Sequence, residues 1–309
     1  MAIHKPVLPK ESVDNLNLRE GSVVVDATLG GGGHSRKILE RIGDKGTLIA
    51  VDIDIKALES FIKFPIKTKN IRLVNKNFSD LENILLTIGI EKVDAILADL
   101  GYSSDQLEDE EIGMSFTKDS PLDMRLDRSG ELSARDVVND YSEENLEKVI
   151  REYGEEKFWR RITKAIINAR KIKPIETTAE LSKIITRAVP EKYTYGKIHE
   201  ATRTFQAIRI EVNRELENLK VFIPQAIEAL SSGGRLAIIS FHSLEDRIVK
   251  RQYKENAGGC ICPPEFPKCQ CGRTPKIRII TKKPVKATDL EVADNPRARS
   301  AKLRVCEKI

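Results

Sequence analysis

The sequence predicts an α/β protein of the Rossmann-like class, in which a mostly parallel sheet carries an inserted helical subdomain. Short continuous apolar runs alternate with amphipathic stretches through the first hundred residues, and this alternation returns near the C-terminus. Continuous apolar runs are typical of strands buried on both faces of a parallel sheet. A charged segment with helical periodicity interrupts the alternation. We therefore expect a core domain over residues 1–104 and 210–309 and an inserted helical subdomain, for substrate recognition, over residues 105–209.

The expected elements follow from hydrophobic period and from turn residues. The predicted parallel strands are Ser22–Asp26, Thr47–Asp52, Ile71–Val74, Val93–Asp99 and Arg235–Ser240, and a closing β pair is predicted at Ile277–Thr281 and Lys302–Cys306. The predicted helices include His34–Ile42, Glu143–Tyr153, Glu156–Lys171, Thr178–Ala188, Leu244–Lys254 and one long helix, Ile210–Leu230, with Gly233 and Gly234 as its C-cap.

Composition narrows the class of protein. The 309 residues include 52 Lys and Arg against 47 Asp and Glu, a formal net charge of +5, which permits an acidic partner such as RNA without demanding one. No stretch approaches the roughly 20 apolar residues of a membrane span, and the N-terminus lacks the apolar core of a signal peptide. We therefore expect a cytoplasmic protein with no membrane association.

A glycine-rich loop follows the first predicted strand. Asp26 ends that strand, Gly30 and Gly32 follow in the pattern D-x-x-x-G-x-G, and Asp52 ends the next strand. Glycines allow close backbone approach to a ligand, and an acid at the second strand end can bind both hydroxyls of a ribose. The dinucleotide pattern G-x-G-x-x-G and the P-loop are both absent. The pattern is similar to the first motif of S-adenosylmethionine-dependent methyltransferases; the alternative is a glycine turn without a ligand.

The fourth strand ends in the segment DLGYSS, residues 99–104. It occupies the place of the motif (D/N/S)-P-P-(Y/F) in enzymes that methylate amino groups. An acceptor at Asp99 or at the Leu100 carbonyl would hold the N–H protons of an exocyclic amine and localise its lone pair for attack. Tyr102 could stack on the base. The alternative is a strand end at which Ser103 or Ser104 only caps a helix.

Two further segments carry candidate residues. Arg203, Gln206 and Arg209 lie close together in ATRTFQAIR, where they either contact RNA or pack the insertion against the core. His242, in FHSLEDR after the fifth strand, is a candidate catalytic residue that contacts RNA or assists proton loss. Its alternative is a helix start capped by Ser243, with Asp246 and Arg247 paired locally.

Four cysteines form the pattern C-x-C…C-x-C, which is a weaker zinc signal than paired C-x-x-C knuckles. The pattern therefore predicts either a structural zinc ion or reduced thiols in a loop, at Cys260, Cys262, Cys269 and Cys271. Cys306, alone on a predicted strand, is expected in the core.

Basic side chains gather in the same C-terminal region, where they either follow RNA phosphates or form solvated faces. They form two stretches: Lys268, Arg273, Lys276, Arg278, Lys282, Lys283 and Lys286, then Arg297, Arg299, Lys302 and Arg304.

Taken together, these segments resemble the bacterial 16S ribosomal RNA cytosine-N4 methyltransferases of the MraW type. The matching stretches span nearly the whole chain in order: HKPVLPKE, DATLGGGGHS, DLGYSSDQLED, GMSFTKDSPLDMR, YGEEKFWRRI, HEATRTFQAIRIEVNREL, SGGRLAIISFHSLEDRIVK and NPRARSAKLR. The chain departs from the family's frequent Arg-Gly-Phe-Ser-Phe with IGMSF at residues 112–116. The family also varies at Tyr102, which argues against an indispensable aromatic side chain there.

The resemblance implies a class I methyltransferase sheet of seven strands and S-adenosylmethionine as the methyl donor. It implies cofactor contacts at Gly32, Gly33, His34, Asp52, Phe78, Asp99 and Gln106. The implied reaction is methylation of the 4-amino group of a cytidine in the decoding region of 16S ribosomal RNA, as free RNA or in the small subunit, by a monomer or homodimer. The alternatives are another amine acceptor, in DNA or protein, and a non-catalytic RNA-binding assembly factor.

Overall fold

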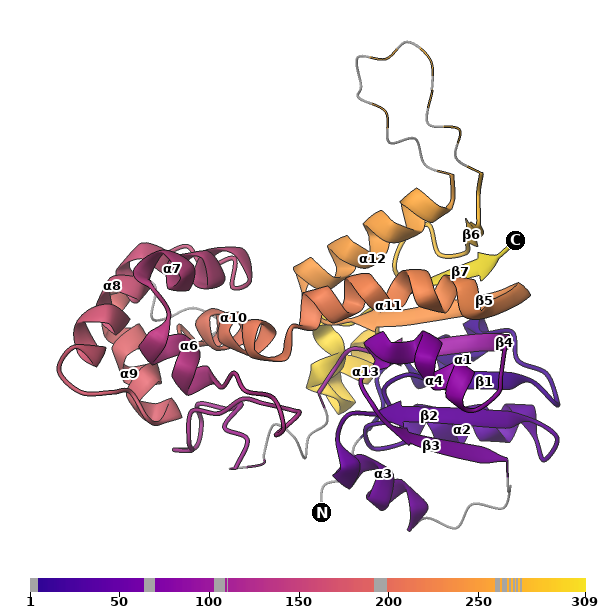
Figure 1. Cartoon of the computed structure of the whole chain (residues 1–309), viewed down its shortest axis with the longest axis horizontal. Coiled ribbons are helices and arrows are strands. Elements are labelled where there is room, and N and C mark those ends of the chain that lie inside the picture. Colours follow the sequence, from indigo (N-terminus) through magenta and orange to yellow (C-terminus); the bar gives the residue numbers. More distant parts are fainter. Residues whose placement is uncertain are drawn as a thin grey trace. The chain divides into compact units, whose positions relative to one another are not determined.

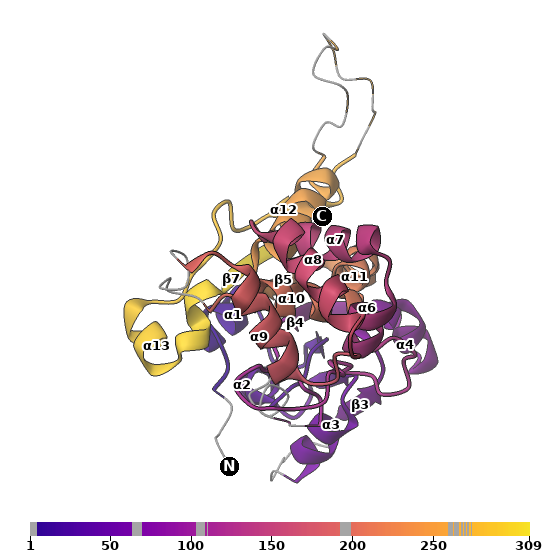
Figure 2. The same ribbon diagram turned by 90° about the vertical axis from the view of Figure 1, so that its left-hand side faces the viewer.

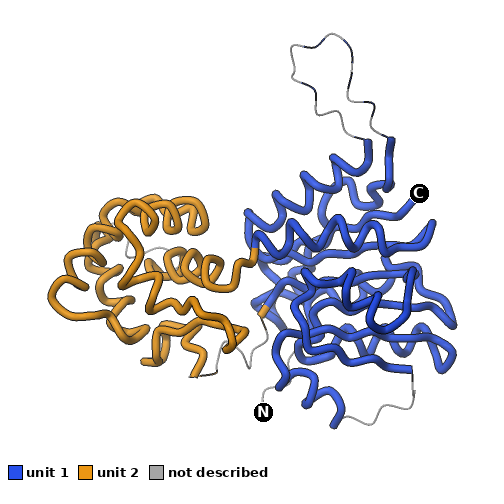
Figure 3. The backbone as a smooth tube through the Cα atoms, viewed as in Figure 1, with its two compact units in different colours: residues 1–101, 216–309 blue, residues 102–215 orange. Residues whose placement is uncertain are grey.

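The computed structural model describes residues 5–63, 70–102, 109, 111–191, 199–258, 262, 266, 268, 270, 272 and 274–309. The chain divides into two compact units, one formed by residues 1–101 and 216–309 and the other by residues 102–215 (Figure 3). This division lies a few residues outside the expected boundaries of the insertion, 105 and 209. None of the helices among the described residues has the length and apolarity needed to cross a bilayer.

The first unit is built on a sheet whose seven described strands follow the order β3-β2-β1-β4-β5-β7-β6. The strands are β1 Val23–Asp26, β2 Thr47–Asp52, β3 Ile71–Asn75, β4 Val93–Asp99, β5 Leu230–Ser240, β6 Ile277–Ile279 and β7 Lys302–Lys308. Strands β1 to β5 pair in parallel, and β7 is antiparallel to both β5 and β6. The predicted seven-stranded α/β sheet, including its closing pair, is confirmed.

Helices cover both faces of this sheet (Figure 1). One face packs against α1 Pro9–Asn15, α2 Gly33–Ile42 and α3 Ile55–Ile62, and the other against α4 Leu81–Thr87, α11 Glu215–Ala229 and α12 Ser243–Asn256. Successive strand residues alternate between the two cores: Val24 belongs to the first and Val25 to the second. A strand buried on both faces needs apolar side chains at every position, which explains the continuous apolar runs in the sequence.

The second unit is helical and has a core of its own. Its helices are α6 Ala134–Asp140, α7 Glu143–Glu152, α8 Trp159–Arg170, α9 Thr178–Ala188 and α10 Thr202–Asn213. Helix α8 packs against both α7 and α9, and α10 packs against α6 and α7 (Figure 2). Capping boxes begin α6 at Ser133 and α9 at Thr177, each closed by an acid three residues later.

The structure corrects the prediction of one long helix over Ile210–Leu230. Helix α10 ends at Asn213, Arg214 adopts a left-handed conformation with φ of 50°, and α11 begins at Glu215. Gly233 and Gly234 are also not a helix C-cap, because they lie within β5. A Cβ on Gly234 would come within 2.9 Å of the Asp94 carbonyl oxygen on the neighbouring strand, so only glycine allows this approach.

Candidate active site

The glycine loop joins β1 to α2 at the carboxyl edge of the sheet. Gly30 has φ of 49°, and a Cβ built on it would meet nothing within 4 Å, so the backbone here borders open space. Gly32, with φ of 70°, is the N-cap of α2 and offers no side-chain cap. The first N–H groups of α2 therefore remain available to an external acceptor, at the positive end of the helix dipole.

Asp52 ends β2 beside this loop. Its carboxylate accepts hydrogen bonds from the Gly30 N–H at 2.7 Å and from the Asp54 N–H at 2.9 Å, one on each oxygen. Each oxygen keeps a further lone pair, so the carboxylate can still bind a pair of hydroxyls. Burial raises the pKa of Asp52 to about 6, so the side chain is mostly ionised above neutral pH. This geometry fits the ribose contact expected at Asp52.

Asp26 ends β1 with its side chain inside the protein. Its side chain is fully buried and accepts hydrogen bonds from the Ser35 hydroxyl at 2.6 Å and from the Thr28 N–H at 3.3 Å. Burial raises its pKa to about 6. Asp26 therefore ties the end of β1 to the first turn of α2 from inside the protein, and it holds the loop in shape.

Asp99 ends β4 and lies next to the glycine loop. Its N–H donates to the Thr28 hydroxyl at 2.7 Å, and its Oδ1 accepts from the Gly101 N–H at 3.3 Å. Its Oδ2 lies 3.6 Å from Nδ1 of His34, whose side chain is also almost fully buried. The structure thus brings Asp99 and His34, two of the expected site residues, into direct proximity.

The pKa of Asp99 is raised to about 7, mainly by burial. The negative charge of Glu245 raises it further, whereas the Gly101 N–H and the positive charge of Arg297 lower it. Near neutral pH the carboxyl group therefore exists in both protonation states. A carboxyl group balanced in this way can accept a proton and also release it, which is the property a group handling a proton needs at neutral pH.

Two aromatic side chains lie just after strands β3 and β5. Phe78 begins the short 3-10 helix η1, Phe78–Asp80, after β3 and packs edge-on against Phe222 with ring centroids 5.1 Å apart. Phe241 follows β5, and a Cβ on Gly101 would lie 2.7 Å from its ring. A side chain at position 101 would therefore force the Phe241 ring to shift, and sequence reasoning singled out neither residue.

His242 is the N-cap of α12, and both of its ring nitrogens are buried without a hydrogen-bond partner among the described residues. Nε2 lies 3.2 Å from Glu245 Oε1, while Glu245 Oε2 accepts from the Phe241 N–H at 2.8 Å. The alternative interpretation of this segment has Ser243 as the cap, whereas the N-cap is His242; Asp246 binds Lys302 and Arg304 on β7. The catalytic role predicted for His242 stays a prediction.

The three candidate RNA-binding residues lie on α10 within the helical unit. Arg203 donates to the Glu155 carbonyl at 3.1 Å, and Gln206 donates to the Tyr153 carbonyl at 3.2 Å. Arg209 forms a two-pronged ion pair with Glu215 at 2.9 and 3.2 Å, and its guanidinium lies 4.0 Å from the ring centroid of Tyr102. All three side chains therefore take part in packing within this unit, and contact with RNA stays a prediction.

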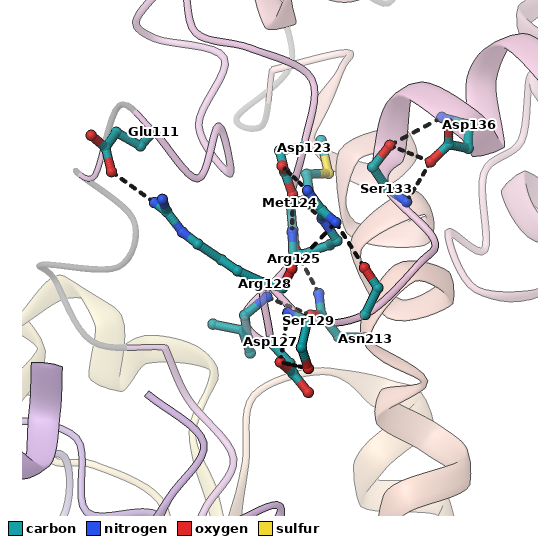
Figure 4. A network of polar contacts seen from close by, with 12 residues as sticks. Glu111, Asp123, Met124, Arg125, Asp127, Arg128, Ser129, Ser133, Asp136 and Asn213 are labelled. Atoms are coloured by element: carbon teal, nitrogen blue, oxygen red, sulfur yellow. Dashed lines mark hydrogen bonds and ion pairs between the residues drawn. The ribbon is translucent and has the colours of Figure 1, made fainter. Parts of the chain in front are cut away.

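A polar network fixes the loop between residues 123 and 136 of the same unit (Figure 4). The Arg125 guanidinium binds both carboxylate oxygens of Asp123 at 2.7 and 2.8 Å and the Gly130 carbonyl at 2.7 Å. Asn213, the last residue of α10, donates to the Met124 carbonyl at 2.8 Å and accepts from the Leu126 N–H at 2.9 Å. This holds buried Met124 at an unfavourable φ of 61°.

Several expected residues lie outside the described part of the chain. Gln106 is one, and Cys260, Cys269 and Cys271 are three of the four candidate zinc ligands. Cys262 is described as a free, half-buried cysteine, and its Sγ accepts from the Gln270 N–H at 3.3 Å. Cys306 is buried in the core as expected. Structural zinc on the cysteine cluster stays a prediction.

The basic C-terminal stretches are partly neutralised within the protein. Lys276 pairs with Glu228 at 2.6 Å, and Arg278 pairs with Glu307. Lys302 and Arg304 both pair with Asp246. By contrast, Lys282, Lys283, Lys286 and Arg299 are exposed and form no ion pair with the described residues. Only part of the basic run can therefore be an electrostatic surface for a polyanion.

Comparison with known proteins identifies the family. The MraW methylase family model matches residues 1–309. The chain belongs to the MraW methylase family. It is 51% identical to ribosomal RNA small subunit methyltransferase H of Caldicellulosiruptor bescii over 99% of each chain. It is 50% identical to that of Clostridium botulinum strain Kyoto over 99% of each, and 48% identical to that of Halothermothrix orenii over 100% of this chain and 99% of the relative. A solved rRNA methylase from Streptococcus thermophilus, with 12% identity, covers 97% of this chain and 93% of its own, with a TM-score of 0.42.

The structure of this family member adds site residues that sequence reasoning missed. The Val7 carbonyl lies 2.9 Å from Nε2 of His34, and the Thr28 hydroxyl holds the Asp99 N–H. Ser35 binds Asp26. Val7 lies in the stretch HKPVLPKE, so the family resemblance marked this segment without revealing its contact. A backbone carbonyl leaves no trace in the residue types of a sequence, and only the fold reveals it.

Proposed function

We propose that this chain transfers a methyl group from S-adenosylmethionine to the 4-amino group of a cytidine in 16S ribosomal RNA. The observation that carries the proposal is the buried carboxyl group of Asp99, at the end of β4 and beside the open glycine loop. Membership of a methylase family supports the reaction type. The choice of ribosomal RNA rests on relatives about 50% identical over nearly the whole chain, which are named ribosomal RNA small subunit methyltransferases.

The described residues fit the proposed cofactor. The open space at Gly30, the uncapped start of α2 and the remaining lone pairs of Asp52 suit a ligand with a ribose and a polar amino-acid end. When bound, S-adenosylmethionine supplies an electrophilic methyl group on a positively charged sulfur. The residues that we propose to hold it are Gly32, Gly33, His34, Asp52, Phe78, Asp99 and Gln106.

The remaining candidate residues act on the acceptor. Asp99 accepts an N–H of the target amine, which localises the nitrogen lone pair for attack. Tyr102 stacks on the base, and His242 contacts RNA near the carboxyl edge of the sheet. The helical unit recognises the substrate through Arg203, Gln206 and Arg209. A ribosomal substrate, as free RNA or as the small subunit, agrees with the expected cytoplasmic location.

Two alternatives make different predictions. A methylase acting on DNA or protein would bind the cofactor but would leave ribosomal RNA unmodified. A non-catalytic assembly factor would bind RNA and transfer no methyl group. The ionisable Asp52 and Asp99 at the glycine loop favour an enzyme, because each carries the free-energy cost of a buried carboxyl group.

The proposal is tested by methyl transfer from labelled S-adenosylmethionine to small subunits from cells that lack this activity. Wild type should produce N4-methylated cytidine, and Asp99→Ala should lose about 10²-fold or more of the rate. Asp44→Asn, at an exposed site, serves as the matched control and should retain wild-type activity. Bound cofactor without transfer to subunits or free RNA would overturn the ribosomal assignment and favour another amine acceptor.

The structural zinc ion is a separate proposal about the cysteine loop. It rests on the spacing C-x-C…C-x-C, in which Cys262 is the described member and accepts a hydrogen bond at its Sγ from the Gln270 N–H. Metal analysis of the purified protein should find about one zinc per chain, and Cys262→Ser should lower that content. An absence of zinc in protein purified without chelators would refute it.

A further inference from the structure

The buried contact between His34 and Asp99 has a defined hydrogen-bonding direction. Nε2 of His34 lies 2.9 Å from the Val7 carbonyl oxygen. A carbonyl oxygen only accepts, so Nε2 carries a proton in this contact. Burial lowers the pKa of His34, which keeps the imidazole neutral. A neutral ring with its proton on Nε2 has a lone pair on Nδ1, and this nitrogen is the one that faces Asp99.

The segment that supplies Val7 is itself held in place. Leu8, the N-cap of α1, adopts a left-handed φ of 50° although its side chain is fully buried. Its N–H donates to Glu291 Oε1 at 2.7 Å, and Lys5 pairs with Asp294 at 2.6 Å. Both acids belong to α13, Asp289–Asp294. These contacts offset the backbone strain at Leu8, and they hold the Val7 carbonyl against His34.

Asp99 presents one oxygen to this histidine. Oδ1 is occupied by the Gly101 N–H at 3.3 Å, and Oδ2 lies 3.6 Å from His34 Nδ1. Two acceptors facing each other repel unless a proton lies between them. The separation is too long for a hydrogen bond, but a slight rotation of a protonated Asp99 side chain would form one. His34 therefore favours the protonated form of Asp99.

Other charged groups also act on Asp99 and on His34. Glu245 and Arg297 act on Asp99 in opposite directions, and burial is the largest influence. Around His34, Asp26 and Glu291 favour the charged ring and Lys37 disfavours it, with burial again dominant. Asp99 Oδ2 lies 3.6 Å from His34 Nδ1, and Asp26 is the carboxyl group whose charge acts most strongly on the imidazole.

We propose that Asp99 receives the proton that leaves the target amine, and that His34 positions Asp99 and shares this proton. The N–H bond of the methylated nitrogen breaks, its electron pair stays on nitrogen, and the proton forms an O–H bond at Asp99 Oδ2. That O–H then donates to the lone pair of His34 Nδ1, so no oxidant or reductant is involved. The inference rests on the proposed function, since it requires an amine acceptor at Asp99. His34 is a positioning residue in this step.

The first test needs neither cofactor nor RNA. Nitrogen-15 spectra of the free protein should show a neutral His34 with Nε2 protonated and Nδ1 unprotonated near pH 7. Asp99→Asn should shift the Nδ1 resonance, because the partner of its lone pair changes. His199→Gln, which removes a histidine outside this pair, should leave the His34 signals unchanged. A charged His34, the opposite tautomer or an unchanged Nδ1 shift in Asp99→Asn would overturn the pair.

The second test separates positioning from packing. His34→Gln can keep a donor to the Val7 carbonyl but has no imidazole to share a proton. Its kcat should fall about 10- to 100-fold with little change in KM for small subunits, a smaller loss than removal of a base. The rising limb of its kcat–pH profile should also move to lower pH, because the acceptor that favours protonated Asp99 is gone. An unchanged profile with unchanged kcat would show that His34 is only structural.

The two tests fail in different ways. If wild type transfers no methyl group to ribosomal RNA, the proposed function fails, and the nitrogen-15 result still reports the His34–Asp99 pair. If wild type is active and His34→Gln matches it in kcat and pH profile, the proposed function stands and this inference fails. Because His34 is also proposed to contact the cofactor, kcat is measured at saturating S-adenosylmethionine, and cofactor binding is followed separately by calorimetry.

Discussion

At the scale of single residues, the carboxyl edge of the sheet concentrates buried carboxyl groups. Burial raises the pKa of Asp26 and Asp52 to about 6 and that of Asp99 to about 7. Each group is stabilised in its neutral form, so the protein loses stability when these groups must ionise. A residue that served only stability would avoid this cost. Several buried carboxyl groups with raised pKa values are instead typical of a functional site.

Replacement of Asp26 by Asn should therefore flatten the pH dependence of stability. The pKa of Asp26 is about 6 in the folded protein against 3.8 without the fold, so its stabilisation is complete below pH 3.8 and is lost as pH rises through 6. The unfolding free energy of Asp26→Asn relative to wild type should rise by about 2.4 kcal/mol from pH 4 to pH 7. Denaturant unfolding at several pH values measures it, with exposed Asp44→Asn as control. A variant that keeps the wild-type pH dependence would show that Asp26 is ionised in the fold.

At the scale of elements, helix α10 ends where the sequence gives no signal for an end. Hydrophobic periodicity continues through Arg214, and neither Gly nor Pro stands at the break. The left-handed conformation of Arg214 and the hydrogen bonds of Asn213 to the Met124 loop together end the helix. Those bonds join residues far apart in sequence, which explains why the expectation of one long helix was wrong.

Arg214→Gly should strengthen the end of α10, because glycine adopts a left-handed φ without the strain of a Cβ. The gain is about 0.5–1 kcal/mol after the larger entropy of glycine in the unfolded chain is deducted. Hydrogen exchange of the last α10 amides measures it, and protection should rise about two- to fivefold. Arg214→Ala keeps the Cβ and removes the same exposed side chain, so it should show no gain. Equal protection in both variants would mean that the break is unstrained.

At the scale of the whole molecule, the sequence predicted elements better than contacts. The bounds of β2, β4 and α9 agree with the expected Thr47–Asp52, Val93–Asp99 and Thr178–Ala188, because apolar runs and a capping box mark them locally. The contact between the Val7 carbonyl and His34 depended on a backbone atom 27 residues away and could not be predicted. The basic run likewise gave no sign of its ion pairs, such as Lys276–Glu228, because these form only in the fold.

Basic residues with and without an ion pair to the described residues should differ in their contribution to RNA binding. We expect the triple variant Lys282→Gln, Lys283→Gln, Lys286→Gln to weaken binding to ribosomal RNA and to reduce the slope of log K against log salt by about 2–3. The matched control is Lys276→Gln, Arg278→Gln, Lys308→Gln, which removes the same charge from residues already paired with Glu228 and Glu307. Its slope should change by less than about one, because paired cations release few counterions from RNA. Equal slopes for the two variants, measured by filter binding across salt concentrations, would show that only net charge attracts the RNA and that lysines 282, 283 and 286 are ordinary solvated residues.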